Sequence, residues 1–272
     1  MRLCPTVISE ALLKSLVEGP LLLEDLPEAH VFEIDSLCLP VEEVSLNLQQ
    51  KLGHLYEDAL GVLLDSTPRY GSIDRGIQIR KVAGHTLGEL DFLIEDLDLE
   101  RLVHLELAVK FYLAVEGAEG ILLPGPDARD NYFRKLDKMR SHQLRLVRSH
   151  RHLLSDAYRE REIEVQQLVQ GCVFNHIAAD RLVKAEFLSP KGRRGRWLHA
   201  EECVDYFGKD TVIEIIPKPL WPVPLEFLTE MKLAEWVMDE MLERCVMVRV
   251  GGENTPYFIA PNGYPENGFS RR

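Results

Sequence analysis

Apolar and polar residues alternate most regularly between Thr86 and Tyr112, in two runs separated by an acidic segment, 95–100. A period of two is typical of a strand that buries one face. The first run gathers its small and apolar residues on one face, namely Gly88, Leu90, Phe92 and Ile94. The second run does so with Leu105, Leu107, Val109, Phe111 and Leu113. The pattern therefore predicts an antiparallel hairpin in which each strand also has a more polar face.

Two acidic residues are expected to meet across this hairpin. Asp91 and Glu106 are equidistant from the centre of the turn, between Asp98 and Leu99. A symmetric hairpin would make them direct neighbours, with Cβ atoms roughly 5 Å apart. Like charges at that distance destabilise, and a divalent cation would offset their repulsion. A half-exposed hairpin whose polar faces simply meet water explains the same alternation without a metal.

The remaining pattern predicts alternating helices and strands. Helical periodicity covers residues 9–19, 41–64, 127–154, 199–207 and 224–245. Strand-like runs cover residues 77–82, 163–177, 183–187, 212–216 and 245–250. Asp127 or Asp130 is expected to cap the helix that follows the hairpin.

This order predicts an α/β fold with a mixed sheet flanked by helices and a smaller C-terminal α+β part. Residues 1–40 are expected to form a helical and extended lead-in, and residues 41–180 the core. Residues 181–250 would form the C-terminal extension, and residues 251–272, rich in Gly, Pro and Asn, a loose tail.

Composition narrows the class of protein. Among 272 residues, 46% are hydrophobic and 28% charged, which is typical of a globular domain. The five cysteines form no Cys-x-x-Cys pair, and no apolar stretch is long enough for a signal peptide or a membrane span. We therefore expect a cytoplasmic protein with reduced thiols and no membrane partner. Motifs for nucleotide-binding loops, dinucleotide binding and serine nucleophiles are absent.

Charge is unevenly distributed along the chain. The net charge of −12 has the wrong sign for a generic nucleic-acid binder, yet residues 126–198 hold 16 basic and 9 acidic residues. The sharpest basic segment is 191–197, which includes Arg193, Arg194, Arg196 and Trp197. It is either a flexible hairpin loop that binds phosphates and stacks Trp197 on a base, or a solvated turn with Trp197 in the core.

The hairpin resembles the PD-(D/E)XK nuclease superfamily, in which an Asp on one strand and a Glu-x-Lys on the next hold a metal ion. Asp91 matches the Asp, within Gly-Glu-Leu-Asp, and Glu106 matches the Glu. Ala108 stands where the lysine belongs, and Lys110 follows two residues later on the same face. Further stretches resemble an uncharacterised bacterial family of unknown function with such a core. They are 52–57, 125–130 and 142–144.

The resemblance implies a restriction-endonuclease-like core and a set of roles for its residues. Asp91, Glu106 and the carbonyl of Leu107 would hold Mg²⁺ or Mn²⁺. Lys110 would point toward the Asp91–Glu106 pair, to stabilise developing charge or to orient the attacking water. A carboxylate at Glu57 or Glu89 would assist, although a boundary position facing water is the simpler interpretation of Glu57. The helix after the hairpin would line the cleft with Lys138, His142 and Gln143, although a solvated charged face is the simpler interpretation of its basic residues.

The expected function is metal-dependent phosphodiester hydrolysis of nucleic acid, with DNA preferred to RNA as the partner. The alternative is a catalytically inactive nuclease-like fold that acts as a nucleic-acid-binding or protein-interaction module. Ala108 in the position of the lysine is the main support for the alternative. Neither hypothesis fixes an oligomeric state.

Overall fold

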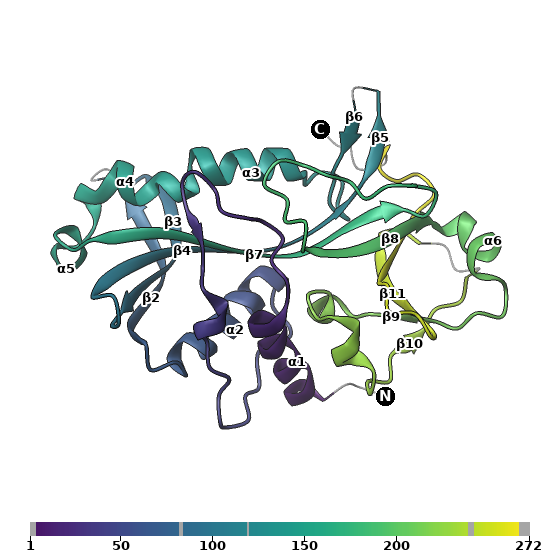
Figure 1. Cartoon of the computed structure of the whole chain (residues 1–272), viewed down its shortest axis with the longest axis horizontal. Coiled ribbons are helices and arrows are strands. Elements are labelled where there is room, and N and C mark those ends of the chain that lie inside the picture. Colours follow the sequence, from purple (N-terminus) through teal and green to yellow (C-terminus); the bar gives the residue numbers. More distant parts are fainter. Residues whose placement is uncertain (1–3, 82–83, 119, 239–241, 267–272) are drawn as a thin grey trace.

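One mixed ten-stranded sheet organises the computed structural model, which describes residues 4–81, 84–118, 120–238 and 242–266 (Figure 1). Its strands are β1 (His30–Val31), β2 (Tyr70–Arg80), β3 (Thr86–Asp96), β4 (Arg101–Leu113), β7 (Ile163–His176), β8 (Arg193–His199), β9 (Ile213–Ile215), β10 (Ala234–Glu235), β11 (Val246–Val250) and β12 (Tyr257–Ala260). Their order is β10-β9-β11-β12-β8-β7-β4-β3-β2, and β1 also pairs with β7. The core from β4 through β7 and β8 to β12 is parallel, and antiparallel strands complete both sides.

Helices cover both faces of this sheet. The α-helices are α1 (Pro5–Glu18), α2 (Leu52–Asp65), α3 (Tyr132–Ser141), α4 (Leu146–His150), α5 (Asp156–Arg159) and α6 (Cys203–Phe207). Short 3₁₀ turns connect them, namely η1 (Ile34–Ser36), η2 (Gln143–Arg145), η3 (Arg151–Leu153), η4 (Ala200–Glu202), η5 (Lys218–Leu220) and η6 (Leu225–Leu228). In Figure 1, α1 and α2 lie on one face, and α3 and α4 on the other. The predicted mixed sheet flanked by helices is confirmed.

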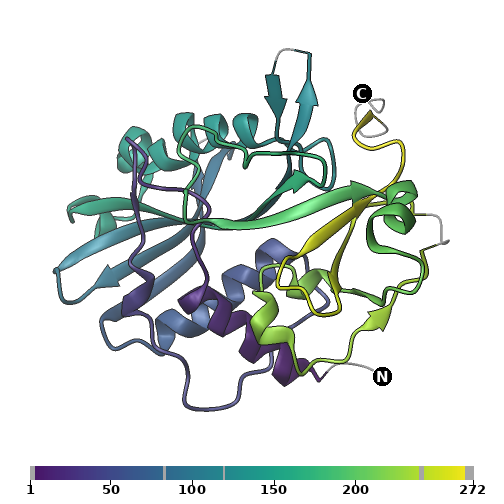
Figure 2. The ribbon, with the colours of Figure 1, turned by 45° about the vertical axis from the view of Figure 1, so that its right-hand side comes forward.

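A small hairpin stands apart from the main sheet. Strands β5 (Val115–Gly117) and β6 (Gly120–Leu122) pair only with each other among the described strands. They project from the molecule on the side of α3, as Figure 1 and Figure 2 both show. No described helix is long and apolar enough to cross a membrane. All five cysteines are free.

The predicted central hairpin is confirmed as β3 and β4, with its turn over residues 97–100. Its register runs from Asp96↔Arg101 to Phe92↔Leu105, which is the symmetric register that the sequence predicts. The apolar face of β4 packs against α2, and one buried cluster contains Leu105, Leu107, Phe111 and Leu113. Alternation along β4 therefore places Glu106 on the opposite face, toward α3.

The predicted single apolar face of β3 is wrong, because the strand changes face at Asp91. Phe92 packs in the cluster that contains α2, whereas Leu90 packs with Leu146 of α4. The pairs Arg75↔Phe92 and Ile77↔Leu90 put Gly76 opposite Asp91, and Gly76 has a φ of 62°. A left-handed residue in the partner strand breaks the regular pleat here. Because of this irregularity, Leu90 and Phe92 point to opposite faces of the sheet, although they are two residues apart.

Several predicted helices are shorter than expected. The predicted helix 41–64 begins only at Leu52, and the predicted helix 127–154 breaks into α3, η2, α4 and η3. Its cap is Asn131, whose side chain accepts from the N–H groups of Phe133 and Arg134, not Asp127 or Asp130. At His142 the backbone leaves the helical region, with a φ of −127°, and this ends α3.

Two predicted elements in the C-terminal half are wrong. Residues 183–187 form no strand, and Phe187 has a φ of 60°, which interrupts an extended run. Of the predicted helix 224–245, the described residues 224–238 and 242–245 contain only the turn η6 and the strand β10, and the carbonyls of Leu228 and Met231 accept from the guanidinium of Arg249. A side chain of β11 therefore occupies these two carbonyls. Further along the chain, β10 pairs with β9.

The C-terminal extension and the core share one sheet. β8 pairs with β7, and β12 lies between β8 and β11. Residues 257–260 therefore form a central strand, and the predicted loose tail is wrong for them. Residues 267–272 lie outside the described part of the chain.

Candidate functional site

A cavity of about 820 Å³ lies where β4 continues beyond its pairing with β3. Past Phe92↔Leu105, no described strand pairs with β4 on that side, and residues 107–111 border the cavity. The start of α2, the loop 125–130 and α3 form other walls. Its polar and charged lining includes Lys51, Glu57, Asp91, Asp127, Asp130, Lys110, Lys135, Gln143, Lys218 and Tyr264.

Asp91 is the most perturbed carboxylate of the cavity. Its Oδ2 accepts a hydrogen bond of 2.9 Å from the backbone N–H of Leu107 on β4. Burial raises the pKa of Asp91 to about 7, and the negative charges of Glu106 and Glu57 act in the same direction. A carboxyl group with such a pKa is stabilised in its ionised form by any cation that enters the cavity.

Glu106 lies behind Asp91, with only 1% of its surface exposed. Its Oε1 lies 2.9 Å from His104 Nε2, and its Oε2 accepts a 2.7 Å hydrogen bond from Gln143 Nε2. Glu106 is close enough to Asp91 to raise its pKa, but it does not line the cavity. Both of its oxygens are therefore engaged by protein donors.

Lys135 supplies a partly buried positive charge to the site. It projects from α3, and its Nζ donates to Gln143 Oε1 at 3.0 Å. Burial lowers the pKa of Lys135, as do the charges of Lys110 and Lys138, while Glu106 opposes this shift. The ammonium also lowers the pKa of Asp91. Lys135, Gln143 and Glu106 thus form one hydrogen-bonded chain from the cavity wall into the sheet.

The expected orientation of Lys110 is wrong. Its Nζ pairs with Asp130 Oδ2 at 2.9 Å, and no ion pair joins it to Asp91 or Glu106. Asp130 lies on the loop before α3, where its carboxylate attracts the flexible lysine stem away from the strand. Both residues still border the cavity.

The two remaining acidic candidates differ in position. Glu57 on α2 lines the cavity, and its Oε2 lies 3.2 Å from His54 Nδ1. Glu57 therefore faces the site while remaining partly in solvent. Glu89 is exposed, accepts from Gln78 Nε2 at 3.3 Å, and does not line the cavity.

Of the three candidates expected on the helix after the hairpin, the structure brings only Gln143 to the cavity. It lies on η2, not on a continuous helix. Lys138 and His142 are exposed and do not border the cavity. The break at His142 is what turns Gln143 toward Glu106.

The predicted basic loop at 191–197 is wrong, because most of it is β8. Arg193 donates to the carbonyls of Trp221 and Pro222, and Arg194 to those of Val183 and Ser189. A third guanidinium, that of Arg196, donates to the carbonyls of His176 and Ala179. Trp197 is buried and donates to the carbonyl of Ala114, as the alternative interpretation expected. These side chains hold loops in place.

Sequence reasoning missed four residues of the cavity, namely Asp130 as an ion-pair partner, Lys135, Lys218 and Tyr264. Lys135 is one of many basic residues on its helix, and only the three-dimensional position of α3 distinguishes it. His104, which contacts Glu106, belongs to the predicted polar face of β4, and its alternation with Glu106 is the signal that could have identified it.

A second cluster was also missed. His176, His199 and Glu202 place their ligand atoms within 4.8 Å of one another, and no other group of three or more His, Cys, Asp or Glu does so in the described residues. They come from the ends of β7 and β8 and from η4.

The fold and the cavity define a mixed α/β protein with a carboxylate- and lysine-lined site at an open strand edge. The family model described as "Domain of unknown function (DUF1853)" matches residues 22–259. The chain therefore belongs to this family, which confirms the predicted membership of a family of unknown function. No curated protein and no solved structure matches the chain.

Proposed function

We propose that this protein hydrolyses phosphodiester bonds of nucleic acid with the help of a divalent metal ion. One observation carries the proposal: Asp91, Glu57 and Lys135 converge on a single cavity at the edge where β3 leaves β4. The cavity volume of about 820 Å³ lies within the range of ligand-binding sites in proteins. The resemblance to PD-(D/E)XK nucleases supports the same function.

The residues of the cavity fit Mg²⁺ or Mn²⁺. These ions are commonly held by one or two carboxylates plus water. Among the described residues, no donor reaches the second oxygen of Asp91. In a strand, the C=O and N–H of one residue point to the same side, so the Leu107 carbonyl faces the edge from which its N–H reaches Asp91. Asp91 and this carbonyl would hold the ion, with Glu57 assisting.

Glu106 is less well placed than Asp91 to bind the metal ion. It would join the ligands only by exchanging the hydrogen bond from Gln143 or His104 for the ion. As placed, it acts through Asp91, because its buried charge raises the pKa of that carboxylate and favours a cation beside it. When bound, the ion would neutralise charge and lower the pKa of an attacking water.

Lys135 takes over the role for which the sequence suggested Lys110. Its Nζ donates to Gln143, which in turn donates to Glu106, whereas Lys110 is paired with Asp130. A partly buried ammonium beside the scissile phosphate would stabilise the charge that develops in the transition state. Lys51, Lys110 and Lys218 line the same cavity and would bind the flanking phosphates.

The alternative is an inactive nuclease-like fold that binds nucleic acid or protein. The engagement of both Glu106 oxygens supports it, as does Ala108 in the lysine position of the superfamily motif. Retained metal binding is compatible with both proposals, so turnover must separate them.

The test is cleavage of labelled single- and double-stranded DNA and RNA with Mg²⁺ or Mn²⁺. DNA is the first substrate class to try, on the resemblance alone. We expect cleavage by the wild type and none by Asp91→Asn. Glu89→Gln is the matched control, because Glu89 lies two residues away on β3 but outside the cavity. Binding without cleavage of any substrate would favour the inactive module.

A further inference from the structure

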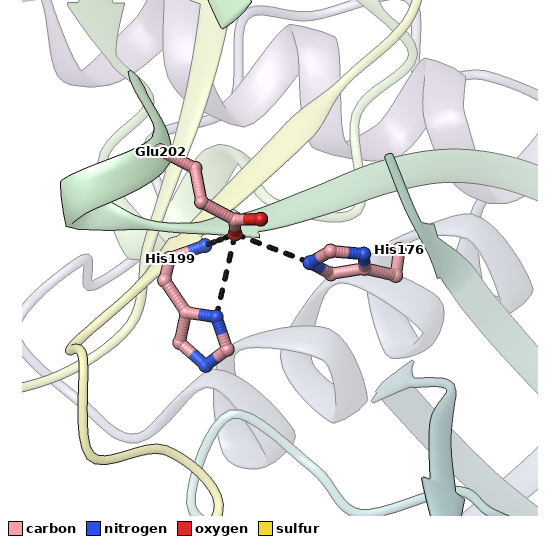
Figure 3. Close-up of side chains that lie close together, drawn as sticks. All are labelled: His176, His199 and Glu202. Carbon is pink, nitrogen blue, oxygen red and sulfur yellow. Dashed lines mark hydrogen bonds and ion pairs between the residues drawn. The ribbon is translucent and has the colours of Figure 1, made fainter. Parts of the chain in front are cut away.

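His176, His199 and Glu202 converge at one end of the parallel part of the sheet (Figure 3). His176 ends β7 and His199 ends β8, and these neighbouring strands run parallel. Glu202 closes η4, the turn that directly follows β8. The carboxyl ends of adjacent parallel strands lie at the same edge of a sheet, which explains why residues distant in sequence meet here.

We propose that these three side chains bind a transition-metal ion of the zinc class. Zinc lies about 2.0–2.1 Å from imidazole nitrogen and carboxylate oxygen, so ligand atoms around a tetrahedral ion are about 3.3 Å apart. Glu202 Oε2 lies 3.1 Å from His176 Nε2 and 3.3 Å from His199 Nδ1. The side chains are 24–33% exposed, which leaves solvent access for a fourth ligand.

The hydrogen bonds of His199 leave Nδ1 as the ring atom that would bind the ion. Its Nε2 lies 2.9 Å from the carbonyl of Tyr264, which can only accept, so Nε2 carries the proton. In the neutral ring, Nδ1 then presents a lone pair to the Glu202 carboxylate at 3.3 Å. The same ring accepts from the backbone N–H of Glu202, which satisfies this lone pair when no ion is bound. A metal ion at Nδ1 would replace that contact and would separate the lone pair from the carboxylate. Metal-binding histidines commonly donate their other N–H to a carbonyl, as His199 Nε2 does to Tyr264.

The cluster is held in place before any ion binds. The N–H of His199 donates to Glu202 Oε2 at 2.7 Å, which fixes the carboxylate. The ring of Trp197 lies against both imidazoles, with centroid distances of 4.6 Å to His176 and 5.1 Å to His199. Ligands that are already ordered lose little conformational entropy on binding.

Two contacts oppose the ion, and the first is the backbone N–H of Glu202, which donates to the His199 ring. The N–H of Ala178 donates to His176 Nδ1 at 3.3 Å, which keeps the ring proton on Nε2. Metal binding at Nε2 would move that proton to Nδ1 and cost this hydrogen bond. A distance of 3.3 Å is longer than usual for an N–H donor, so the hydrogen bond is weak. Losing it costs little compared with the free energy gained by forming a metal–nitrogen bond.

The bound ion would also stabilise one wall of the main cavity. The carbonyl of Tyr264 is the acceptor that orients His199, and the ring of Tyr264 lines the cavity. The hydroxyl of the same residue donates to the carbonyl of Gly125 at 2.9 Å. An ion at the cluster thus fixes β7, β8 and the segment that carries Tyr264, a structural role independent of the chemistry at Asp91.

The test uses the full chain carrying Asp91→Asn, so that the cavity does not compete for metal. We expect one equivalent of Zn²⁺ to bind and to raise the melting temperature, and Co²⁺ to give a visible absorption band that Zn²⁺ abolishes. Adding His176→Ala or Glu202→Gln should weaken Zn²⁺ binding by at least about tenfold. His30→Ala is the matched control, because His30 is an exposed histidine far from the cluster in sequence.

Equal Zn²⁺ affinity in the His176→Ala, Glu202→Gln and His30→Ala proteins would overturn the proposal. A sulfur ligand at about 2.3 Å in the X-ray absorption spectrum of the Zn²⁺ form would also overturn it, since the cluster contains only nitrogen and oxygen donors. Glu202→Gln keeps the oxygen that accepts from the His199 N–H. It therefore decides the question if His176→Ala does not fold.

Discussion

The Asp91 carboxylate accepts a 2.9 Å hydrogen bond from the backbone N–H of Leu107. A side chain of β3 therefore takes the place of a backbone–backbone hydrogen bond between β3 and β4. Backbone pairing between the two strands reaches only Phe92↔Leu105. The next stretch of β4 therefore has an open edge, and that edge is one wall of the cavity. The site depends on this interruption, because a continued ladder would cover the Leu107 carbonyl.

Metal should stabilise the wild type through Asp91. An ion that binds only the folded state adds about 2.7 kcal/mol at a concentration of 100 times its Kd. We therefore expect Mn²⁺ to raise the melting temperature of a protein carrying His176→Ala, which removes the second cluster. Adding Asp91→Asn to that protein should abolish the increase. Identical responses to Mn²⁺ by differential scanning calorimetry would mean that Asp91 is not a ligand.

Lys135→Met should reduce turnover more than Lys110→Met does. Removing one group that stabilises transition-state charge typically costs about 10²–10³ in kcat. Lys135 is partly buried and linked to Glu106 through Gln143, whereas Lys110 is engaged by Asp130. We therefore expect Lys135→Met to lower kcat, and Lys110→Met chiefly to raise KM, because a contact to a flanking phosphate contributes mainly to substrate binding.

Steady-state kinetics on the best cleaved substrate measures both effects. The reverse pattern, with kcat lost in Lys110→Met and retained in Lys135→Met, would restore Lys110 as the functional lysine. Melting temperatures of both variants provide the control for folding.

Stability should depend on pH through Glu28. The hydrogen bond from Arg140 lowers the pKa of this nearly buried carboxylate, and Arg145 adds to the effect. A lowered folded-state pKa contributes stability above the unfolded pKa of about 4.3, and this contribution is lost as pH falls through the folded value. Glu28→Gln should therefore destabilise the protein at pH 7. Urea unfolding should show the difference shrinking below about pH 4, whereas a constant difference would exclude the ion pair as its cause.

Gly171 should be intolerant of any side chain. It has a φ of 145°, and a Cβ there would lie 1.7 Å from the carbonyl oxygen of Lys110 on the neighbouring strand. Gly171→Ala should destabilise the fold by about 3 kcal/mol or more, because backbone atoms of two central strands must separate. Gly53→Ala is the matched control, since a Cβ there meets no atom within 4 Å. Equal unfolding free energies would contradict the close β4–β7 approach.

The hairpin and its register could be predicted because both depend on local information. Alternation defines each strand, and the turn fixes which residues face each other. The change of face at Asp91 could not be predicted from the sequence of β3. Its cause is the left-handed conformation of Gly76, which lies on β2. The sequence predicts Glu106 as the cross-strand neighbour of Asp91, but its burial and its engagement by Gln143 depend on where α3 ends.

Charged residues were harder to place than apolar ones. Alternation indicates which side of a strand faces the core, but it does not say which partner a long side chain reaches. Lys110 binds Asp130 from a loop, and Arg193 binds carbonyls of the segment 221–222. A run of basic residues on β8 therefore resembled a phosphate-binding loop, although its guanidinium groups are occupied by the fold.

The most direct test of the central claim is the single-turnover cleavage rate of end-labelled DNA in Mg²⁺ or Mn²⁺. We predict measurable cleavage by the wild type that is abolished by EDTA and by Asp91→Asn, reduced by Glu57→Gln, and unchanged by Glu89→Gln. As a control for folding, the melting temperature of each variant in EDTA must be equal to or higher than that of the wild type. Cleavage that persists at the wild-type rate in Asp91→Asn, or wild-type protein that binds the metal and DNA but cleaves no strand, would contradict metal-dependent hydrolysis at this site.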